Sequence, residues 1–76
     1  MEEINIDNIY KTIGQNVAKY RKEAGLSQLE LSLKLGYKSV SIVATAERYY
    51  NKKHFNLKHL YKIAYILNKK VCDFLP

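Results

Sequence analysis

The side chains that could bind a metal ion or act in catalysis are few and widely spaced. Two histidines, a cysteine and the aspartate beside it make up this set: His54, His59, Cys72 and Asp73. Zinc ligands recur at short, characteristic spacings, and neither the two histidines nor the Cys72 and Asp73 pair has such a spacing. The sequence therefore predicts no metal site and no cofactor.

Motifs of enzyme active sites are also missing from the sequence. It contains no glycine-rich phosphate-binding loop and no Gly-x-Ser-x-Gly nucleophile motif. The few acidic residues are scattered over separate segments or stand where they cap a helix or pair with a basic residue. The sequence therefore predicts a protein that is not an enzyme.

Positive charge is the clearest chemical signal, and it is concentrated in the second half of the chain. The net charge is +6. Residues 1–33 hold four basic and five acidic residues, whereas residues 34–70 hold nine basic residues and Glu47 alone as an acid. A one-sided basic surface favours a polyanion, because each neutralised phosphate releases counterions. A lysine-rich surface that serves only solubility explains the same charge equally well.

Length and composition predict one small globular domain spanning residues 1–76. A core of this size supplies modest stability, so tight packing or self-association is expected. Hydrophobic residues make up 47% of the chain, a globular composition. Cys72 is a lone cysteine, and neither a leader sequence nor an apolar run of about 20 residues is present. These features predict a cytoplasmic protein that does not enter a membrane.

Apolar periodicity predicts a first helix over residues 8–24, after an N-terminal extension of residues 1–7. The apolar positions recur every three or four residues: Ile6, Ile9, Ile13, Val17 and Tyr20. Asp7 or Asn8 is the expected cap and Gly25 the expected end. Gly14, inside the helix, predicts close approach of a neighbouring helix.

A second and a third helix are predicted to follow in close succession. Ser27 and Glu30 have the spacing of a capping box, and a leucine-rich segment that reads as mostly buried runs from there to Gly36. Ser39 is the expected cap of the third helix, which extends to about Arg48. Two short helices joined by a tight turn are typical of a DNA-binding helix-turn-helix.

The last third of the chain is predicted to contain a loop and two further helices. Residues 48–55 lack periodicity, and their aromatic residues, Tyr49, Tyr50 and Phe55, are expected to seal the core. Asn56 caps a fourth helix over residues 57–67, with Asn68 as its end. Its inward stripe is Leu57, Leu60, Ile63, Ala64 and Leu67. Tyr61 and Tyr65 either form a dimer contact or cover a final short helix over residues 70–75.

From about Ile13 to Leu75 a set of residues follows a known pattern: Ile13, Gly14, Arg21, Gly25, Leu26, Ser27, Gln28, Leu31, Leu35, Gly36, Ser39, Glu47, Leu60, Ile63, Ala64, Leu67 and Asp73. In these residues the chain resembles the lambda-repressor-like helix-turn-helix family of phage repressors, Cro proteins and xenobiotic response element regulators. The resemblance implies an all-α, five-helix domain whose third helix reads the major groove.

The resemblance also implies residue roles. It assigns base-facing positions to Val40, Ser41, Ala44 and Thr45. It assigns DNA-backbone contacts to Gln28, Lys38, Ser39, Arg48, Lys52 and Lys53. It implies a buried structural ion pair between Arg21 and Glu47.

The base-facing set contains no Arg, Asn or Gln, the side chains that make bidentate base contacts. We therefore expect readout through thymine methyl groups, single hydroxyl contacts and DNA shape, with phosphate contacts supplying most of the affinity.

The leading hypothesis is a sequence-specific regulator of transcription that binds double-stranded DNA as a homodimer, in the role of a small repressor or autoregulatory controller. One alternative is a protein-interaction module on a helix-turn-helix scaffold that docks an unknown partner through Val40, Ile42 and nearby tyrosines. Another is an RNA or single-strand binder that uses Tyr49, Tyr50 and the lysines.

Overall fold

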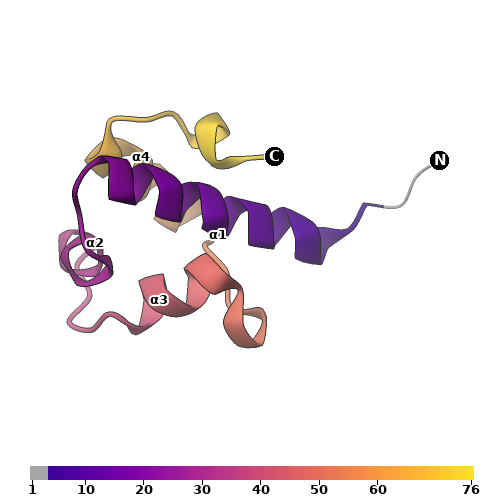
Figure 1. Ribbon diagram of the computed structural model, residues 1–76, viewed down its shortest axis with the longest axis horizontal. Helices are drawn as coiled ribbons and strands as arrows, with labels where there is room; N and C mark the ends of the chain where they lie inside the picture. The colour runs from indigo at the N-terminus through magenta and orange to yellow at the C-terminus, as the bar shows by residue number, and fades with distance from the viewer. Residues whose placement is uncertain (1–3) are drawn as a thin grey trace.

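The computed structural model describes residues 4–76, and within that range it contains helices and no strand. Four α-helices and two short 3₁₀ helices follow one another in the order α1 (Ile6–Glu23), α2 (Gln28–Lys34), α3 (Ser41–Arg48), η1 (Tyr50–Lys52), α4 (Leu57–Leu67) and η2 (Val71–Phe74) (Figure 1). The all-α prediction is confirmed. The count of five α-helices is wrong, because the last predicted helix is a single 3₁₀ turn.

Several helix ends follow the predicted capping chemistry. Ser27 Oγ accepts a hydrogen bond from the Glu30 N–H, and the Glu30 carboxylate accepts one from the Ser27 N–H, so the capping box is confirmed. Asn56 caps α4, and Asn68 ends it in the left-handed conformation, with φ of 55°. Gly25, with φ of 75°, closes the end of α1.

Two helix starts differ from the prediction. The cap of α1 is Asn5, whose side chain accepts a hydrogen bond from the Asn8 N–H, so neither Asp7 nor Asn8 is the cap. The predicted extension of residues 1–7 is therefore shorter, and residues 1–3 lie outside the described range. At α3 the N-cap is Val40, with no side-chain bond, in place of Ser39. The Ser39 hydroxyl accepts from the Ser41 N–H at 3.4 Å, a distance too long for a strong cap.

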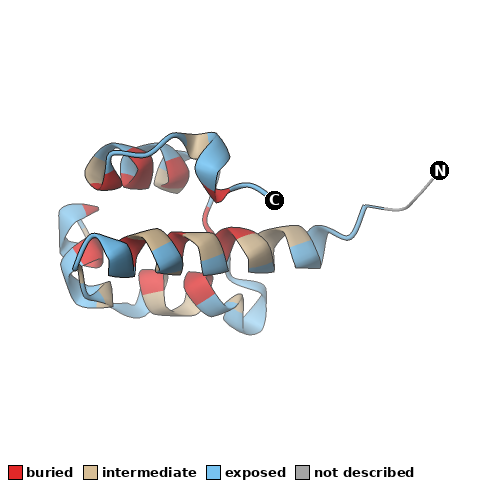
Figure 2. Cartoon of the chain, turned by 45° about the horizontal axis from the view of Figure 1, so that its top comes forward, coloured by how far each residue is buried: buried red, intermediate tan, exposed pale blue. Residues whose placement is uncertain are grey.

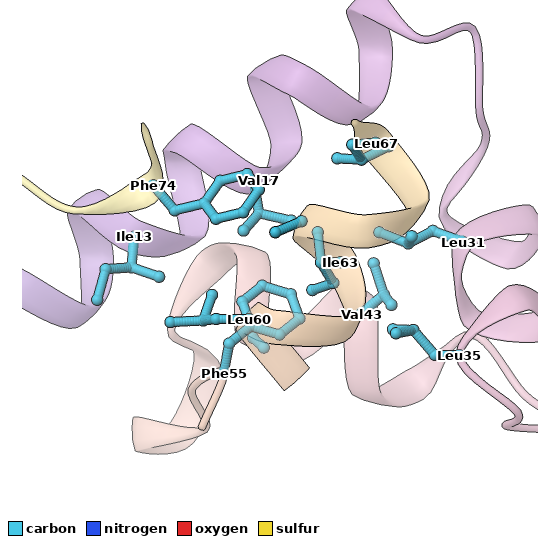
Figure 3. Close-up of a cluster of buried hydrophobic side chains, with 12 residues drawn as sticks. Ile13, Val17, Leu31, Leu35, Val43, Phe55, Leu60, Ile63, Leu67 and Phe74 are labelled. Carbon is cyan, nitrogen blue, oxygen red and sulfur yellow. The ribbon is translucent and has the colours of Figure 1, made fainter. Parts of the chain in front are cut away.

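The core gathers one face from each α-helix and η2. Buried side chains point inward from α1, α2, α3 and α4 (Figures 2 and 3). The fully buried hydrophobic members are Val17, Leu31, Val43, Ile63 and Phe74. Asn16 Nδ2 donates to the Phe74 carbonyl at 2.9 Å and ties η2 to α1. The helix α1 thus supports both the helix-turn-helix and the end of the chain.

Gly14 lets α1 and α3 approach each other, as the sequence predicts. A Cβ atom at this position would lie 2.6 Å from the carbonyl oxygens of both Ala46 and Glu47. Real Cβ atoms essentially never come that close to an oxygen. The glycine therefore sets the distance between the central helix and α3.

Some predicted core residues are exposed. The second helix is not mostly buried, because Leu29 and Leu33 are about half exposed; a short helix that is apolar all round can turn only one face to the core. Ile6, in the first turn of α1, is also exposed, and so is Leu57, in the first turn of α4, both beyond the edge of the core.

The aromatic residues near the end of the chain also differ in part from the prediction. Phe55 is buried as expected, whereas Tyr50 is 60% exposed and does not seal the core. Tyr61 and Tyr65 are exposed as well, so they do not cover η2.

Candidate nucleic-acid interface

The outer face of α3 is presented to solvent. Val43, Ala46 and Glu47 anchor the helix in the protein. Ser41 and Arg48 are exposed, and Ala44 and Thr45 are partly exposed. These four positions are separated by three or four residues, so they share one side of the helix. The side of α3 opposite its anchor is therefore small, polar and basic at its end.

The hydroxyl groups at the start of α3 are organised by local hydrogen bonds. Thr45 Oγ1 donates to the Ser41 carbonyl at 2.7 Å, so its hydrogen is used within the helix while its lone pairs and its methyl group remain available. The Ser39 and Ser41 hydroxyls lie 3.1 Å apart. The surface therefore offers a hydrogen-bond acceptor and a methyl group at Thr45 and a serine hydroxyl one turn earlier, at Ser41.

A buried network holds α3 against α1 and α2. Arg21 Nε donates to Glu47 Oε2 at 2.7 Å, and a terminal guanidinium nitrogen donates to Oε1 at 3.1 Å. Arg21 also donates to the Leu26 carbonyl, and Gln28 Nε2 donates to Glu47 Oε1 at 2.9 Å. Both charged residues are 6% exposed. Gln28 therefore has an internal structural partner, besides the DNA contact expected of it.

Basic side chains flank α3 on both sides in the sequence. Lys38 and Ser39 are exposed in the turn before it, and Lys52 and Lys53 are exposed in the segment after it. The Arg48 guanidinium lies over the Tyr50 ring, 5.4 Å from its centre, a cation–π contact that limits where this charge can go. Tyr50 is therefore a positioning residue for Arg48.

The basic segment after α3 has an unusual backbone. Tyr49, Asn51 and Lys52 adopt left-handed conformations with φ of 54°, 53° and 61°. Residues other than glycine adopt this conformation at an energetic cost, so surrounding contacts must hold them in place.

An aromatic cluster at the start of α1 supplies such contacts. The Tyr49 hydroxyl donates to Asp7 Oδ1 at 2.6 Å. This bond raises the pKa of Tyr49 to about 12, because it favours the protonated phenol. The Tyr10 ring stacks on both Tyr49 and His54. The first turn of α1 therefore holds the segment that carries Lys52 and Lys53.

Two open hollows border α3. One, of about 400 Å³, lies between α3 and the basic segment and is lined by Ile42, Thr45, Ala46, Asn51, Lys52, Lys53, His54 and His59. The other, of about 520 Å³, lies where α1, the start of α2 and the end of α3 meet, and is lined by Gln15, Ala18, Lys19, Arg21, Lys22, Gln28, Glu47 and Arg48. Basic side chains border both hollows, and such groups make most of the phosphate contacts in protein–DNA complexes; the Glu47 carboxylate also lines the second hollow.

The residues predicted for this site lie around α3, together with others that sequence reasoning missed. Val40, Ser41, Ala44 and Thr45 lie on or beside the outer part of α3, with Arg48 at its end and Gln28 in the second hollow. Sequence reasoning missed four residues that border the hollows: Gln15, Lys19, Lys22 and Asn51. The spacing of Gln15, Lys19 and Lys22 by four and three positions was the available signal, because it places them on one side of α1.

In the part of the chain that the structure describes, no three His, Cys, Asp or Glu side chains lie close enough together to hold a metal ion. No helix between residues 4 and 76 is long and apolar enough to cross a bilayer.

Comparisons with known proteins agree with this architecture. A family model described as helix-turn-helix matches residues 17–74. Among solved structures, apo-HppE is similar to this chain with a TM-score of 0.76 and 19% identity over 90% of this chain and 36% of that one. The iron(II) form of HppE in complex with substrate has the same TM-score and identity over 88% and 37%. The chain thus spans little more than a third of those proteins, and the likeness shows the fold alone. No curated protein matches the chain.

Proposed function

The chain belongs to the lambda-repressor-like helix-turn-helix family of DNA-binding regulators, and we propose that it binds specific sequences in double-stranded DNA by placing α3 in the major groove. The family is a regulatory family and not an enzyme family. In this proposal, residues 1–76 form one DNA-binding domain. The protein is cytoplasmic, in the compartment where it can reach DNA.

The observation that carries this proposal is the arrangement of α3. Its inner side is anchored by Val43, Ala46 and the Glu47 network, while its outer side exposes small and polar residues, with Lys38 before the helix and a basic segment after it. The major groove of B-form DNA is wide enough for an α-helix, and phosphates border the groove on both sides. In this arrangement the small, uncharged residues on the outer side of α3 face the bases. The basic residues before and after the helix face the phosphates on either side of the groove.

Residue roles follow from this placement. Val40, Ser41, Ala44 and Thr45 face the bases, with the Thr45 methyl group suited to a thymine methyl and its oxygen to a base amino group. Phosphates are bound by Gln28, Lys38, Ser39, Arg48, Lys52 and Lys53, supplemented by Lys19 and Lys22 from α1. Two such helices in a homodimer bind half-sites about 34 Å apart. A small repressor or autoregulatory controller is the role that we propose for the dimer.

The experiment separates base contacts from phosphate contacts. Duplexes are selected from a random pool at physiological salt, and the affinity of the full chain for the selected duplex is then measured over a range of salt concentrations. Replacing Lys52 and Lys53 with Gln flattens the dependence of log affinity on log salt, by about 0.9 for each phosphate that is no longer bound. Replacing Ser41 with Ala or Thr45 with Val changes the preferred sequence and leaves the slope unchanged.

Two controls make the result specific. Gln substitutions at Lys58 and Lys62, which are exposed on α4, remove the same charge from another element and have the smaller effect on DNA affinity. Single-stranded competitors of the same sequence bind weakly, because the Tyr49 hydroxyl and ring are occupied by Asp7 and Tyr10. Equal effects of both lysine pairs, or selection of no preferred duplex, contradict the proposal.

A further inference from the structure

A second exposed surface lies on α4. Leu57, Tyr61 and Tyr65 are 66%, 65% and 89% exposed. They follow one another at intervals of four residues, so they form a continuous ridge along one side of the helix, here called the α4 ridge. One leucine and two tyrosines in a row on a small domain are typical of a surface that binds another protein.

The surroundings of the α4 ridge are positively charged. Lys58 and Lys62 are exposed on the same helix, each next in sequence to a ridge residue. No Asp or Glu occurs between Glu47 and Asp73. Any segment that docks along the ridge therefore meets apolar and aromatic groups bordered by ammonium groups.

The α4 ridge also lies away from the proposed DNA-binding side. Figure 2 shows α4 and α3 at opposite edges of the fold, with α1 across the middle of the view. His59 of α4 borders the hollow beside α3, but it lies two positions from both Leu57 and Tyr61 and therefore on another side of the helix. The other side of α4 is buried through Leu60 and Ile63, so the ridge points out of the core. If α3 occupies the major groove, as the proposed function requires, the ridge remains open to a partner in the DNA complex.

We infer that the α4 ridge is a docking surface for an acidic amphipathic helix of a partner protein. The apolar side of such a helix packs along Leu57, Tyr61 and Tyr65, and its carboxylates pair with Lys58 and Lys62. A second copy of this chain is less suitable, because a two-fold contact here brings the lysines of both copies together.

The test uses designed peptides of about 18 residues, five helical turns. One peptide carries leucines at helical spacing with glutamates elsewhere, and its counterpart carries lysines in place of the glutamates. Binding to the full chain is measured by fluorescence anisotropy. The acidic peptide is expected to bind saturably and the basic peptide not to bind.

Matched variants locate the binding surface. Replacing both Tyr61 and Tyr65 with Ser weakens binding of the acidic peptide at least about tenfold, while Tyr50→Ser, at an exposed tyrosine outside the ridge, leaves it unchanged. Gln at Lys58 and Lys62 weakens binding, whereas Gln at Lys52 and Lys53 does not. Circular dichroism verifies that each variant folds, as expected for substitutions at exposed positions.

Three results overturn the inference. One is the absence of saturable binding of the acidic peptide. Another is an equal loss of binding with both lysine pairs, which indicates general attraction to a basic protein. The third is a change from dimer to monomer in the tyrosine variant, measured by sedimentation, which makes a second copy the occupant. DNA affinity measured on the same variants tests α3 separately, so a failure here is distinguishable from a failure of the proposed function.

Discussion

Glu47 joins three parts of the molecule through a single carboxylate. It accepts hydrogen bonds from Arg21 on α1 and from Gln28 at the start of α2, while its own backbone belongs to α3. A buried ion pair of this kind adds little net stability over an apolar pair, but removing one partner leaves a charge without compensation. Its role here is to hold three helices in one arrangement.

Glu47→Ala is therefore expected to destabilise the protein by about 3 to 5 kcal/mol, since Arg21 stays buried with only the Leu26 carbonyl as acceptor. Urea denaturation followed by circular dichroism measures this loss. The double variant Arg21→Met and Glu47→Leu, which removes both charges, recovers most of it. A single variant that is as stable as the double variant contradicts the prediction.

His59 is a neutral part of the α4 cap. Its Nδ1 accepts from the Asn56 N–H at 3.1 Å, so its proton lies on Nε2, which donates to the Tyr37 hydroxyl at 2.8 Å. Burial, followed by the charges of Lys62, Lys58 and His54, lowers the pKa of His59 below its ordinary value of 6.5. Protonation of Nδ1 also removes the acceptor of the cap.

A histidine whose pKa is lower in the folded state takes up its proton more readily when unfolded. The contribution of neutral His59 to the free energy of unfolding is therefore fully present above pH 6.5. It decreases as the pH falls below that value. His59→Gln retains a cap acceptor at this position and lacks the titration. Below pH 6.5, the free energy of unfolding of the native protein, measured from denaturation curves, should fall relative to that of His59→Gln as the pH decreases. A difference between the two free energies that does not change with pH contradicts the prediction.

At the scale of elements, the approach of α1 to α3 is the decisive packing contact. Gly14 lies against the carbonyl oxygens at the end of α3, where a backbone atom cannot move aside as the tip of a flexible side chain can. The first turn of α1 then reaches the segment after α3 through Tyr10 and Asp7. The helix α1 therefore positions both α3 and the basic segment that follows it.

Gly14→Ala is expected to lower the free energy of unfolding by about 1 to 3 kcal/mol, because the added methyl group forces α1 and α3 apart. Thermal denaturation measures the change. Gln15→Ala, at the exposed neighbouring position, serves as the control and has little effect. A Gly14→Ala protein of unchanged or increased stability shows that the helices separate without cost.

The bond between Tyr49 and Asp7 gives a second prediction at this scale. The pKa of Tyr49 is raised from 10.0 to about 12, so the unfolded chain loses this proton at a lower pH than the folded protein does. The stability advantage of the native protein over Tyr49→Phe is therefore present below pH 10 and disappears as the pH rises toward 12. Urea denaturation of both proteins, from below pH 10 up to about pH 12, measures this advantage. An advantage that stays constant over that range contradicts the prediction.

At the scale of the whole molecule, the proposed DNA-binding side and the α4 ridge occupy different sides of one core. The four α-helices and η2 supply that core, and none of its fully buried hydrophobic residues, such as Val17 and Ile63, belongs to either surface. Each surface can therefore be altered with little change in stability.

The proposed homodimer makes a geometric prediction about its DNA site. Two α3 helices related by a two-fold axis require half-sites about 10 base pairs apart, one helical turn. Inserting about five base pairs between the half-sites places them on opposite sides of the duplex and should abolish tight binding. Gel-shift titrations measure this effect; equal affinity for both spacings indicates binding as a monomer.

The sequence alone determined the helical class, the capping box at Ser27 and Glu30, the ends of helices at Gly25 and Asn68, and the tight packing at Gly14. These features depend on local hydrogen bonds, on backbone conformation and on periodicity, all of which are read from neighbouring residues. The sequence also led to the family and to the segment that forms α3.

Only the tertiary structure decided which residues stay at the surface and which partners meet across the chain. Leu57 and the two leucines of α2 match an inward pattern, yet they are exposed, because the core has room for one side of each short helix. The bond from Tyr49 to Asp7 joins residues 42 positions apart, and no local pattern encodes such a contact. Burial and long-range pairing depend on how the helices pack together, and that is a property of the folded chain as a whole.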